Sequence, residues 1–286
     1  MNSSAYNLSH ITQALVDVGI QHGDSVFLST GLGMLGAADG VRSKEDLNRL
    51  FLRAIKRALG AEGTIFVPAY SYAFGNSSKN APTIFDPLTA PPKVGPFPDF
   101  FLKQKGVVRS LDPMLSVAGL GPAAETLFKD LSPTSHGDDC LYARLLGHPN
   151  AKCLNLGIGP NWIPFLHHVD WLANVPFRYD KYFFGGIEGP TGIDYVDWHY
   201  SVAVQLAECK ADAHKLGKMA VDQGIWTYSP LGRGRVYASD YHQLFEFSLK
   251  SIQNNRWLTA RGPACDVTKK RQEEIEKSAL QSADGH

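Results

Sequence analysis

A strand, a long amphipathic helix and a second strand follow one another between residues 23 and 70, and this order constrains the fold more than any other feature. The segment SKEDLNRLFLRAIKRALG (43–60) has an apolar stripe at helical spacing, a capping pattern of Ser43 and Asp46, and Gly60 at its end. It lies between GDSVFLST and GTIFVPAY, which have the pattern of buried strands. Strands joined through a helix of this length form a crossover unit, so we predict parallel strands in an α/β fold.

The other segments fit the same fold class. Further helices are predicted at residues 9–20, 122–131 and 268–283, and further strands at 114–120 and 152–159. Residues 195–208 are compatible with either strand or helix. Six prolines between residues 75 and 99 are expected to exclude regular structure, while the apolar and aromatic content of this stretch indicates an ordered wall or lid. Residues 1–286 are therefore predicted to form one domain, and a subdomain after about residue 180 stays open.

Charge and cysteine content limit the class of protein. Lys plus Arg and Asp plus Glu both number 28, and this zero net charge argues against a general nucleic-acid binder. Cys140, Cys153, Cys209 and Cys265 form no C-x-x-C pair, which favours free thiols in a cytoplasmic protein. The N-terminal stretch lacks a basic start followed by an apolar run, and no apolar stretch approaches the length of a membrane span. We expect a soluble cytoplasmic protein without a nucleic-acid or membrane partner.

The loop after the first predicted strand contains the pattern G-x-G-x-x-G at Gly31, Gly33 and Gly36. This pattern is typical of dinucleotide binding only where a helix opens at the third glycine and an acidic residue ends the next strand. Here the helix begins near Ser43 and the next strand ends in Tyr and Ser, so we reject a nicotinamide site. Glycines also expose backbone N–H groups and allow a ligand to approach closely. The loop is predicted to bind a pantetheine chain or a thioester oxygen, with a plain connecting turn as the alternative.

The segment FLHHVD (165–170) places two histidines ahead of a carboxylate. On a helix His167 and Asp170 share a face, while His168 points about 100 degrees away. A histidine beside a carboxylate gains basicity and a fixed tautomer, which suits a general base. A capping or core histidine held by hydrogen bonds is the alternative.

Other chemistries find less support. In RSLDP (109–113) the first two residues suit a phosphate or an amide, but an aspartate before proline is also a common start for a surface turn. A zinc site would need a third ligand such as His136 or His199, and H-x-x-D lacks the i, i+4 spacing of metal-binding helices. We therefore expect no metal, although a hydrolase using His136, His167 and Asp170 is a testable alternative. The absence of G-x-S-x-G argues against an α/β-hydrolase.

Six segments, taken in order, resemble the aminoglycoside 3-N-acetyltransferase family, also called the antibiotic N-acetyltransferase family. They are GDSVFLSTGLGMLG, GTIFVPAYSYAF, FDP with KVGPFPDFF, GVVRSLDPMLSVAGLG, SHGDDCLYARLL, and LNLGIGPNWIPFLHHVDW followed by PFR. The resemblance covers about residues 8–180. It implies a three-layer α/β/α fold with a mixed central sheet, unlike that of the GNAT acetyltransferases. It also implies transfer of an acyl group from acyl-coenzyme A to a sugar amine, without a metal.

The resemblance assigns roles to individual residues. The family's H-x-x-E matches positions 167–170 with Asp in place of Glu, which selects His167 as the general base and Asp170 as the group that orients it. The family's R-S-x-H-P matches positions 109–113 with Asp112 in place of His, as a second partner of His167 or a holder of the substrate ammonium. Backbone N–H groups near the first strand end would stabilise the oxyanion. Contacts to coenzyme A are expected from Ser29, Thr30, Gly31, Leu32, Gly33, Met34, Leu35, Arg109 and Ser110. Contacts to the acceptor are expected from Tyr70, Tyr72, Phe74, Phe85 and His168.

Three polar positions depart from the pattern of the drug-modifying members. Asp170 replaces Glu, Asp112 replaces His, and residues 29–31 (Ser-Thr-Gly) replace the family's H-S-S. This indicates an altered acceptor pocket. In the region 75–100 the carboxylates that could bind a polycation are Asp86 and Asp99, and the positive charges of Lys79 and Lys93 balance them. We therefore expect the acceptor to be a nucleotide-linked (dTDP-type) amino deoxysugar for surface polysaccharide (lipopolysaccharide) biosynthesis. An aminoglycoside acceptor and, in another class, a non-catalytic ligand-binding protein are the alternatives, and a homodimer is allowed.

Overall fold

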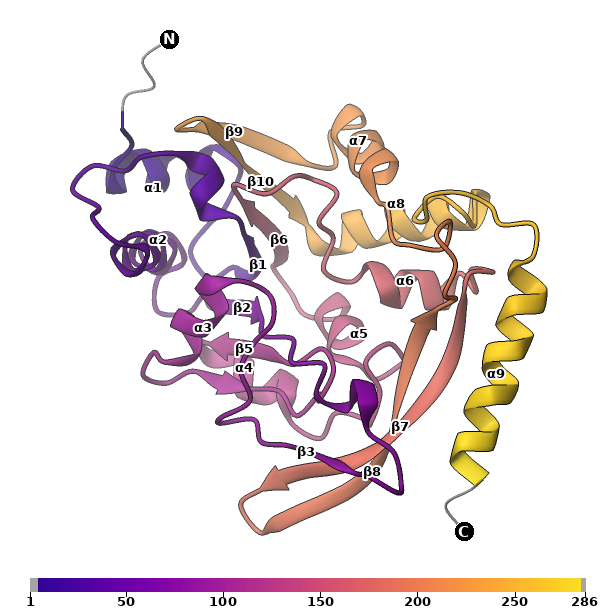
Figure 1. Ribbon diagram of the computed structural model, residues 1–286. Helices are drawn as coiled ribbons and strands as arrows, with labels where there is room; N and C mark the ends of the chain where they lie inside the picture. The colour runs from indigo at the N-terminus through magenta and orange to yellow at the C-terminus, as the bar shows by residue number, and fades with distance from the viewer. Residues whose placement is uncertain (1–4, 284–286) are drawn as a thin grey trace.

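A seven-stranded mixed sheet with helices on both faces forms the centre of the computed structural model (Figure 1). The structure describes residues 5–283. Residues 1–4, part of the stretch considered above for a secretory signal, and residues 284–286 lie outside the described residues. A second sheet of three strands stands beside the first and carries a long hairpin.

The central sheet has the strand order β4-β5-β2-β1-β6-β10-β9. Its parallel core consists of β1 (Ser25–Thr30), β2 (Thr64–Pro68) and β6 (Ala151–Leu156). The outer strands run antiparallel to their neighbours and are β4 (Val108–Arg109), β5 (Val117–Leu120), β9 (Thr227–Leu231) and β10 (Gly234–Asp240). The predicted parallel pair is confirmed, and α2 (Lys44–Leu59) is its crossover helix. The Ser43 Oγ accepts a hydrogen bond from the Asp46 N–H at 3.0 Å, which caps that helix.

The two faces of the sheet bury different sets of apolar side chains, because successive residues of a strand point to opposite sides. On β1, Val26 and Leu28 pack against one layer and Phe27 packs against the other. The first layer contains α1 (Leu8–Asp17), α2 and α3 (Pro96–Leu102). The second contains α4 (Pro122–Phe128), α5 (Leu141–Leu146), α6 (Leu166–Leu172), α7 (His214–Asp222) and α8 (Tyr241–Asn254). The predicted three-layer α/β/α fold with a mixed central sheet is confirmed.

The chain after residue 177 contributes to both sheets. The strands β7 (Arg178–Gly189) and β8 (Gly192–Ala203) form the hairpin, and β3 (Thr83–Phe85) pairs with β7 in parallel. The ambiguous segment 195–208 is thus mostly strand, because its residues 195–203 pair with residues 178–186 of β7. The chain then returns to the central sheet through β9 and β10 and ends in α9 (Val267–Ala283), which lies along β7 (Figure 1).

The expectation that prolines exclude regular structure between residues 75 and 99 is wrong. This stretch contains the short strand β3, the end of the 3-10 helix η2 (Ala73–Asn76) and the start of α3. Pro96 and Pro98 lie in the first turn of α3, where backbone N–H groups have no partner within the helix. The prolines therefore begin a helix here instead of interrupting one.

Two further findings concern the chain as a whole. The side chains of Cys140, Cys153 and Cys209 are buried and that of Cys265 is exposed, and all four thiols are free. Within residues 5–283 the structure contains no helix that is both long and apolar enough to cross a membrane.

Candidate active site

A cavity of about 420 Å³ opens beside the carboxyl ends of β1 and β2, where open α/β sheets usually bind ligands. His167 on α6 lines it, together with Ser29 and Thr30 at the end of β1. The remaining lining residues come from the segments that follow the strands and from the loops around α7. They are Val67, Pro68, Tyr70, Tyr72, Val94, Pro98, Leu115, Ile158, Asn161, Trp162, Ile163, Pro164, Leu166, Ala211, Asp212, Ala213, His214 and Arg261.

His167 and Asp170 lie on one face of α6, and Arg178 at the start of β7 joins them. The distance from His167 Nδ1 to Asp170 Oδ2 is 3.5 Å. The Arg178 guanidinium donates from Nε to Asp170 Oδ2 at 3.1 Å and from Nη2 to His167 Nδ1 at 2.5 Å. Asp170 is buried, and its Oδ1 accepts a hydrogen bond from Thr259 Oγ1 at 2.6 Å. The carboxylate is thus fixed on both sides, and the imidazole is held between this carboxylate and a cation.

The contacts of Nδ1 decide what the other nitrogen of the ring can do. A guanidinium can only donate, so its contact with Nδ1 places the proton of the neutral ring on Nε2. If Nδ1 instead carries the proton toward Asp170, then Nε2 is free to accept one. Burial and the Arg178 charge lower the pKa of His167, and the nearby Asp170 opposes this shift. The ring is therefore neutral at pH 7, as a base must be before it acts.

His168 lies outside the cavity and belongs to the core. Its Nδ1 lies 2.6 Å from the backbone oxygen of His136 and 3.7 Å from Cys140 Sγ. Its ring stacks on Trp171 and packs against Phe245. The expected acceptor contact of His168 is thus contradicted, because the turn of the helix directs adjacent side chains to different surroundings.

Asp112 is a buried turn residue and no contact joins it to His167 among the described residues. Its Oδ1 accepts hydrogen bonds from the backbone N–H groups of Met114 and Leu115, both at 2.8 Å, and from Ser135 Oγ at 3.0 Å. The structure therefore does not bring Asp112 into contact with His167, and the turn-forming alternative describes its hydrogen bonds, while a contact with the substrate ammonium stays a prediction. Burial raises the pKa of the Asp112 carboxyl group to about 6.

This raised pKa predicts a pH-dependent stability that Asp112→Asn removes. The folded protein holds the Asp112 proton more tightly than the unfolded chain, so the free energy of unfolding falls as pH rises from about 4 to 6. A difference of about two pH units corresponds to about 3 kcal/mol. Urea unfolding of both proteins at several pH values measures it. The stability of Asp112→Asn relative to the wild type should increase over this range, and parallel curves would contradict the raised pKa.

Arg109 and Ser110 form hydrogen bonds within the fold and do not line the cavity, and their contact with coenzyme A stays a prediction. The Arg109 guanidinium donates to the backbone oxygens of Ala69 at 2.6 Å and Ala90 at 2.5 Å, and to Ser116 Oγ at 3.1 Å. Ser110 is buried, and its hydroxyl accepts a hydrogen bond from the Val117 N–H at 2.9 Å. Arg109 thereby fastens the proline-rich stretch to the end of β2.

Only Ser29 and Thr30 of the predicted 29–35 stretch line the cavity. Leu32 and Leu35 on η1 (Leu32–Leu35) are buried in the core, and the backbone oxygens of Gly33 and Met34 accept hydrogen bonds from Arg233. The Gly31 N–H donates to Leu156 O at 2.8 Å, so it is not available as the predicted oxyanion donor.

Gly31 and Gly157 allow two segments of the chain to lie close together. A Cβ on Gly157, whose φ is +68°, would lie 2.5 Å from Gly31 O. Glycine at 157 therefore lets the ends of β1 and β6 meet. A plain connecting turn, the alternative to a ligand-binding loop, therefore accounts for the glycine at position 31.

Of the aromatic residues predicted to contact the acceptor, two line the cavity and two do not. The Tyr70 hydroxyl lies 2.8 Å from that of Tyr142, and Tyr72 is partly exposed with a φ of +49°, which is uncommon for a bulky residue. Phe74 and Phe85 are fully buried, and Phe85 lies under the Arg109 guanidinium at 5.3 Å. Their predicted acceptor contacts are contradicted, because both rings fill the core between the proline-rich stretch and β7.

No role for Arg178 is predicted from the sequence, although the PFR segment that contains it belongs to the resemblance. A buried carboxylate such as that of Asp170 needs a nearby cation or hydrogen-bond donors, and this requirement is the sequence signal that indicates Arg178. Thr259 lies 89 positions from Asp170, and no sequence pattern connects the two. His136 packs edge-on against His167 at 5.9 Å between ring centroids, and both of its ring nitrogens are buried without a hydrogen-bond partner among the described residues.

The candidate zinc ligands do not form a metal site. In the described part of the chain, no group of three or more His, Cys, Asp or Glu side chains is placed to hold a metal ion. His199, the other candidate ligand, contacts Thr134 Oγ1 at 2.7 Å and Asp180 Oδ1 at 3.0 Å.

Comparison of the sequence identifies a family. Residues 38–253 match the description "Aminoglycoside 3-N-acetyltransferase". Aminoglycoside N(3)-acetyltransferase IX of Micromonospora chalcea is 30% identical over 182 residues, which are 58% of this chain and 62% of that protein. Aminoglycoside N(3)-acetyltransferase VIII of Streptomyces fradiae is 28% identical over 181 residues, 58% of this chain and 61% of that protein. The chain thus matches about three fifths of the length of these relatives.

Solved structures share the fold at low sequence identity. Sisomicin-bound AAC-VIa has a TM-score of 0.75 and 19% identity, covering 88% of this chain and 99% of that chain. AAC-IIIb in binary complex with CoASH has a TM-score of 0.73 and 19% identity, covering 88% and 97%. The match over residues 38–253 spans most of the sequence, and it confirms the resemblance drawn from the six ordered segments. The chain belongs to the aminoglycoside 3-N-acetyltransferase family.

Proposed function

We propose that the protein is an acyl-CoA-dependent N-acyltransferase with His167 as the general base. The observation that carries this proposal is the position of His167, which lines the cavity at the strand ends while its Nδ1 lies within reach of the buried Asp170. Family membership supports the reaction class, and one solved neighbour contains CoASH. A non-catalytic ligand-binding protein would not need a polarised imidazole at this place.

The mechanism begins with a proton transfer. The acceptor amine, once it has lost its ammonium proton, gives one of its two N–H protons to His167 Nε2 as its nitrogen attacks the thioester carbonyl carbon. The new C–N bond forms, the C–S bond breaks, and the leaving thiolate takes the proton back from the imidazolium. This requires the tautomer with the proton on Nδ1, so His167 must exchange its contact with Arg178 for one with Asp170, whose Oδ2 is 3.5 Å away. Asp170 then stabilises the imidazolium.

The charges of the cavity favour an acceptor with few positive charges. Asp212 supplies the one carboxylate among the lining residues, and it contacts His214 at 2.9 Å. Arg261 lines the same cavity, and most of the remaining wall is apolar. Because aminoglycosides carry several ammonium groups, this wall suits them poorly. We propose an amino deoxysugar linked to a nucleotide of the dTDP type as the acceptor, held by Tyr70 and Tyr72.

An aminoglycoside is the second candidate acceptor, and the names of the curated relatives favour it. In this alternative the base and the acyl donor are the same, and only the acceptor differs. A polycation would have to gain its carboxylate partners from residues outside the cavity wall described above.

A release assay distinguishes the two acceptors. The protein is mixed with acetyl-CoA and either a nucleotide-linked amino deoxysugar or an aminoglycoside, and free thiol is measured against time. We expect release with the nucleotide-linked sugar to exceed release with the aminoglycoside. Faster release with the aminoglycoside would overturn the proposed acceptor, and no release with any amine or acyl-CoA would overturn the transferase.

A further inference from the structure

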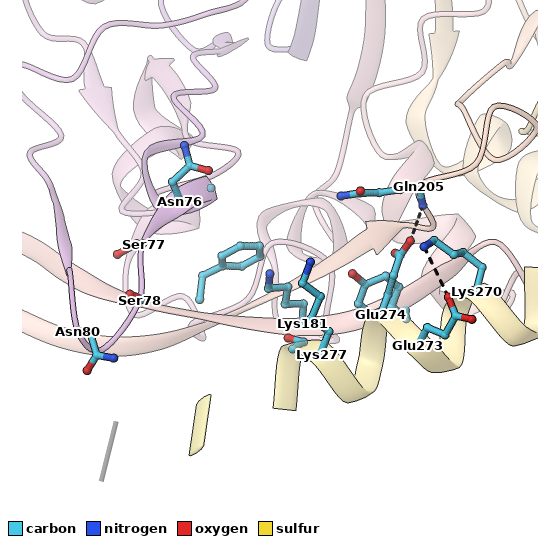
Figure 2. Close-up of a pocket in the computed structure, with 14 residues that line it drawn as sticks. Asn76, Ser77, Ser78, Asn80, Lys181, Gln205, Lys270, Glu273, Glu274 and Lys277 are labelled. Atoms are coloured by element: carbon cyan, nitrogen blue, oxygen red, sulfur yellow. Dashed lines mark hydrogen bonds and ion pairs between the residues drawn. The ribbon is translucent and has the colours of Figure 1, made fainter. Parts of the chain in front are cut away.

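A second and larger cavity, of about 770 Å³, lies between the loop at residues 75–80, the strand β7 and the helix α9 (Figure 2). The helix follows the part of the sequence that matches the family, so this cavity includes a wall that the family match does not cover. Its lining residues are Gly75, Asn76, Ser77, Ser78, Asn80, Tyr179, Lys181, Phe183, Gln205, Lys270, Glu273, Glu274, Lys277 and Ser278.

Two of the lysines that line this cavity form no ion pair among the described residues, although the charge of Glu274 is close enough to raise the pKa of one of them, Lys181. Figure 2 shows Lys181 and Lys277 side by side, and neither forms an ion pair among the described residues. The Lys181 Nζ lies 4.8 Å from the centre of the Phe183 ring. Burial and the neighbouring Lys277 charge lower the pKa of Lys181, with Glu274 opposing. Two like charges held this close repel each other, and a bound anion would remove that cost.

The acidic residues of this cavity are Glu273 and Glu274, and the Oε2 atom of Glu274 is buried without a hydrogen-bond partner among the described residues. Glu273 lies 3.6 Å from the Lys270 ammonium, and Glu274 Oε1 accepts a hydrogen bond from the Gln205 N–H at 3.0 Å (Figure 2). Across the cavity, the loop at 75–80 presents the amide side chains of Asn76 and Asn80, which can donate hydrogen bonds. The side between Lys181 and Lys277 is therefore suited to an anion, with neutral donors opposite.

The cavity is close to the candidate active site along two segments of the chain. Arg178 contacts His167, and Lys181 is three residues further along β7, which corresponds to roughly 10 Å of strand. Tyr72 lines the first cavity, and residues 75–78 line the second, at the other end of the short helix η2. Because Arg178 and Lys181 are an odd number of positions apart, their side chains point to opposite faces of β7, so a ligand that reaches from the base to the two lysines would have to pass over the loop at residues 72–78.

We propose that Lys181 and Lys277 form a phosphate-binding subsite that holds the diphosphate of the acceptor. Lysine binds phosphate as a point charge. A site with two lysines and amide donors is better matched to a diphosphate ligand than to a ligand with a single carboxylate group. The cavity is within the size range of small-molecule sites, so it also has room for a nucleoside. The identity of the ligand as the acceptor rests on the proposed function, and the phosphate subsite itself does not. The phosphates of coenzyme A are the other source of the same chemistry.

Calorimetric titration with dTDP and, separately, with CoA tests the subsite without requiring catalysis. The variants are Lys181→Met and Lys277→Met, and the matched control is Lys269→Met, an exposed lysine of the same helix outside the cavity lining. Each cavity variant should weaken dTDP binding about tenfold or more, because it removes a charge-assisted hydrogen bond to a phosphate oxygen. Lys269→Met should bind dTDP as the wild type does, and CoA affinity should be unchanged in all three.

The possible outcomes separate the subsite from the proposed function. If the wild type binds neither dTDP nor CoA, or if both cavity variants bind them like the wild type, the subsite is overturned. If the cavity variants lose CoA affinity and keep dTDP affinity, the phosphate subsite stands and its assignment to the acceptor is overturned. If dTDP affinity falls as expected while thiol release occurs only with aminoglycosides, the subsite stands and the proposed acceptor fails. Melting temperatures of the variants check that each is folded.

Discussion

His167→Ala should lower kcat/KM for acyl transfer by a factor of about 10²–10⁴, which is the usual contribution of a positioned general base. The variant removes the ring that lines the cavity and leaves Asp170 paired with Arg178 and Thr259. Because the imidazole is partly exposed and its carboxylate partner keeps its other contacts, we expect little change in melting temperature. Thiol release from acetyl-CoA under subsaturating acceptor measures the effect.

The matched control for this substitution is His242→Ala. His242 is an exposed histidine on α8, and it lies 3.7 Å from Glu246 and outside the cavity. It should leave kcat/KM unchanged. His168 is a poor control, because its ring fills the core and its replacement would destabilise the protein. Equal activity of His167→Ala and the wild type would place the base elsewhere.

Arg178→Met should destabilise the protein by about 3–5 kcal/mol, which is the usual cost of breaking a buried ion pair. The guanidinium is buried and donates to Asp170 Oδ2 and to Ser201 O, the latter at 2.7 Å. Without it, the partners of the buried Asp170 carboxylate among the described residues are the Thr259 hydroxyl and His167. Urea unfolding of the variant and the wild type at pH 7 gives the difference.

The same substitution should also shift the pH profile of the reaction. The Arg178 charge lowers the pKa of His167, so its removal raises that pKa and moves the acid limb of kcat/KM to higher pH. A purely structural arginine would lower stability without moving the limb. The double variant Arg178→Met with Asp170→Asn removes both charges and should recover part of the lost stability. If the double variant is no more stable than Arg178→Met, the ion pair is not the source of the loss.

The overall fold could be predicted because it depends on patterns that repeat over many residues. The apolar stripe and the Ser43 cap identify α2 from the sequence alone, and the crossover then makes β1 and β2 parallel. The hairpin of β7 and β8 is harder, because its pairing depends on contacts between strands that neither strand encodes by itself. Helical spacing also identified His167 and Asp170 as neighbours, and helix geometry separated His167 from His168.

Short polar segments were poor guides to the site, because the fold uses polar side chains as well. Asp112 and Arg109 occur in a segment that resembles a family motif, yet their hydrogen bonds hold a turn and a loop. Phe74 and Phe85 were expected beside the acceptor and instead fill the core. Arg178 and Thr259 complete the site from positions 8 and 89 residues away from Asp170, a proximity that only the folded chain reveals.

The pH dependence of kcat/KM tests the role of His167 most directly. In the wild type, after correction for the ionisation of the acceptor amine, kcat/KM should rise with pH through a single pKa below 6.5, because burial and Arg178 lower the pKa of His167. Asp112→Asn should keep this limb, which excludes Asp112, whose pKa burial raises to about 6, as its source. In His167→Ala the residual rate should lack the limb. A limb that persists unchanged in His167→Ala would contradict the assignment of His167 as the base.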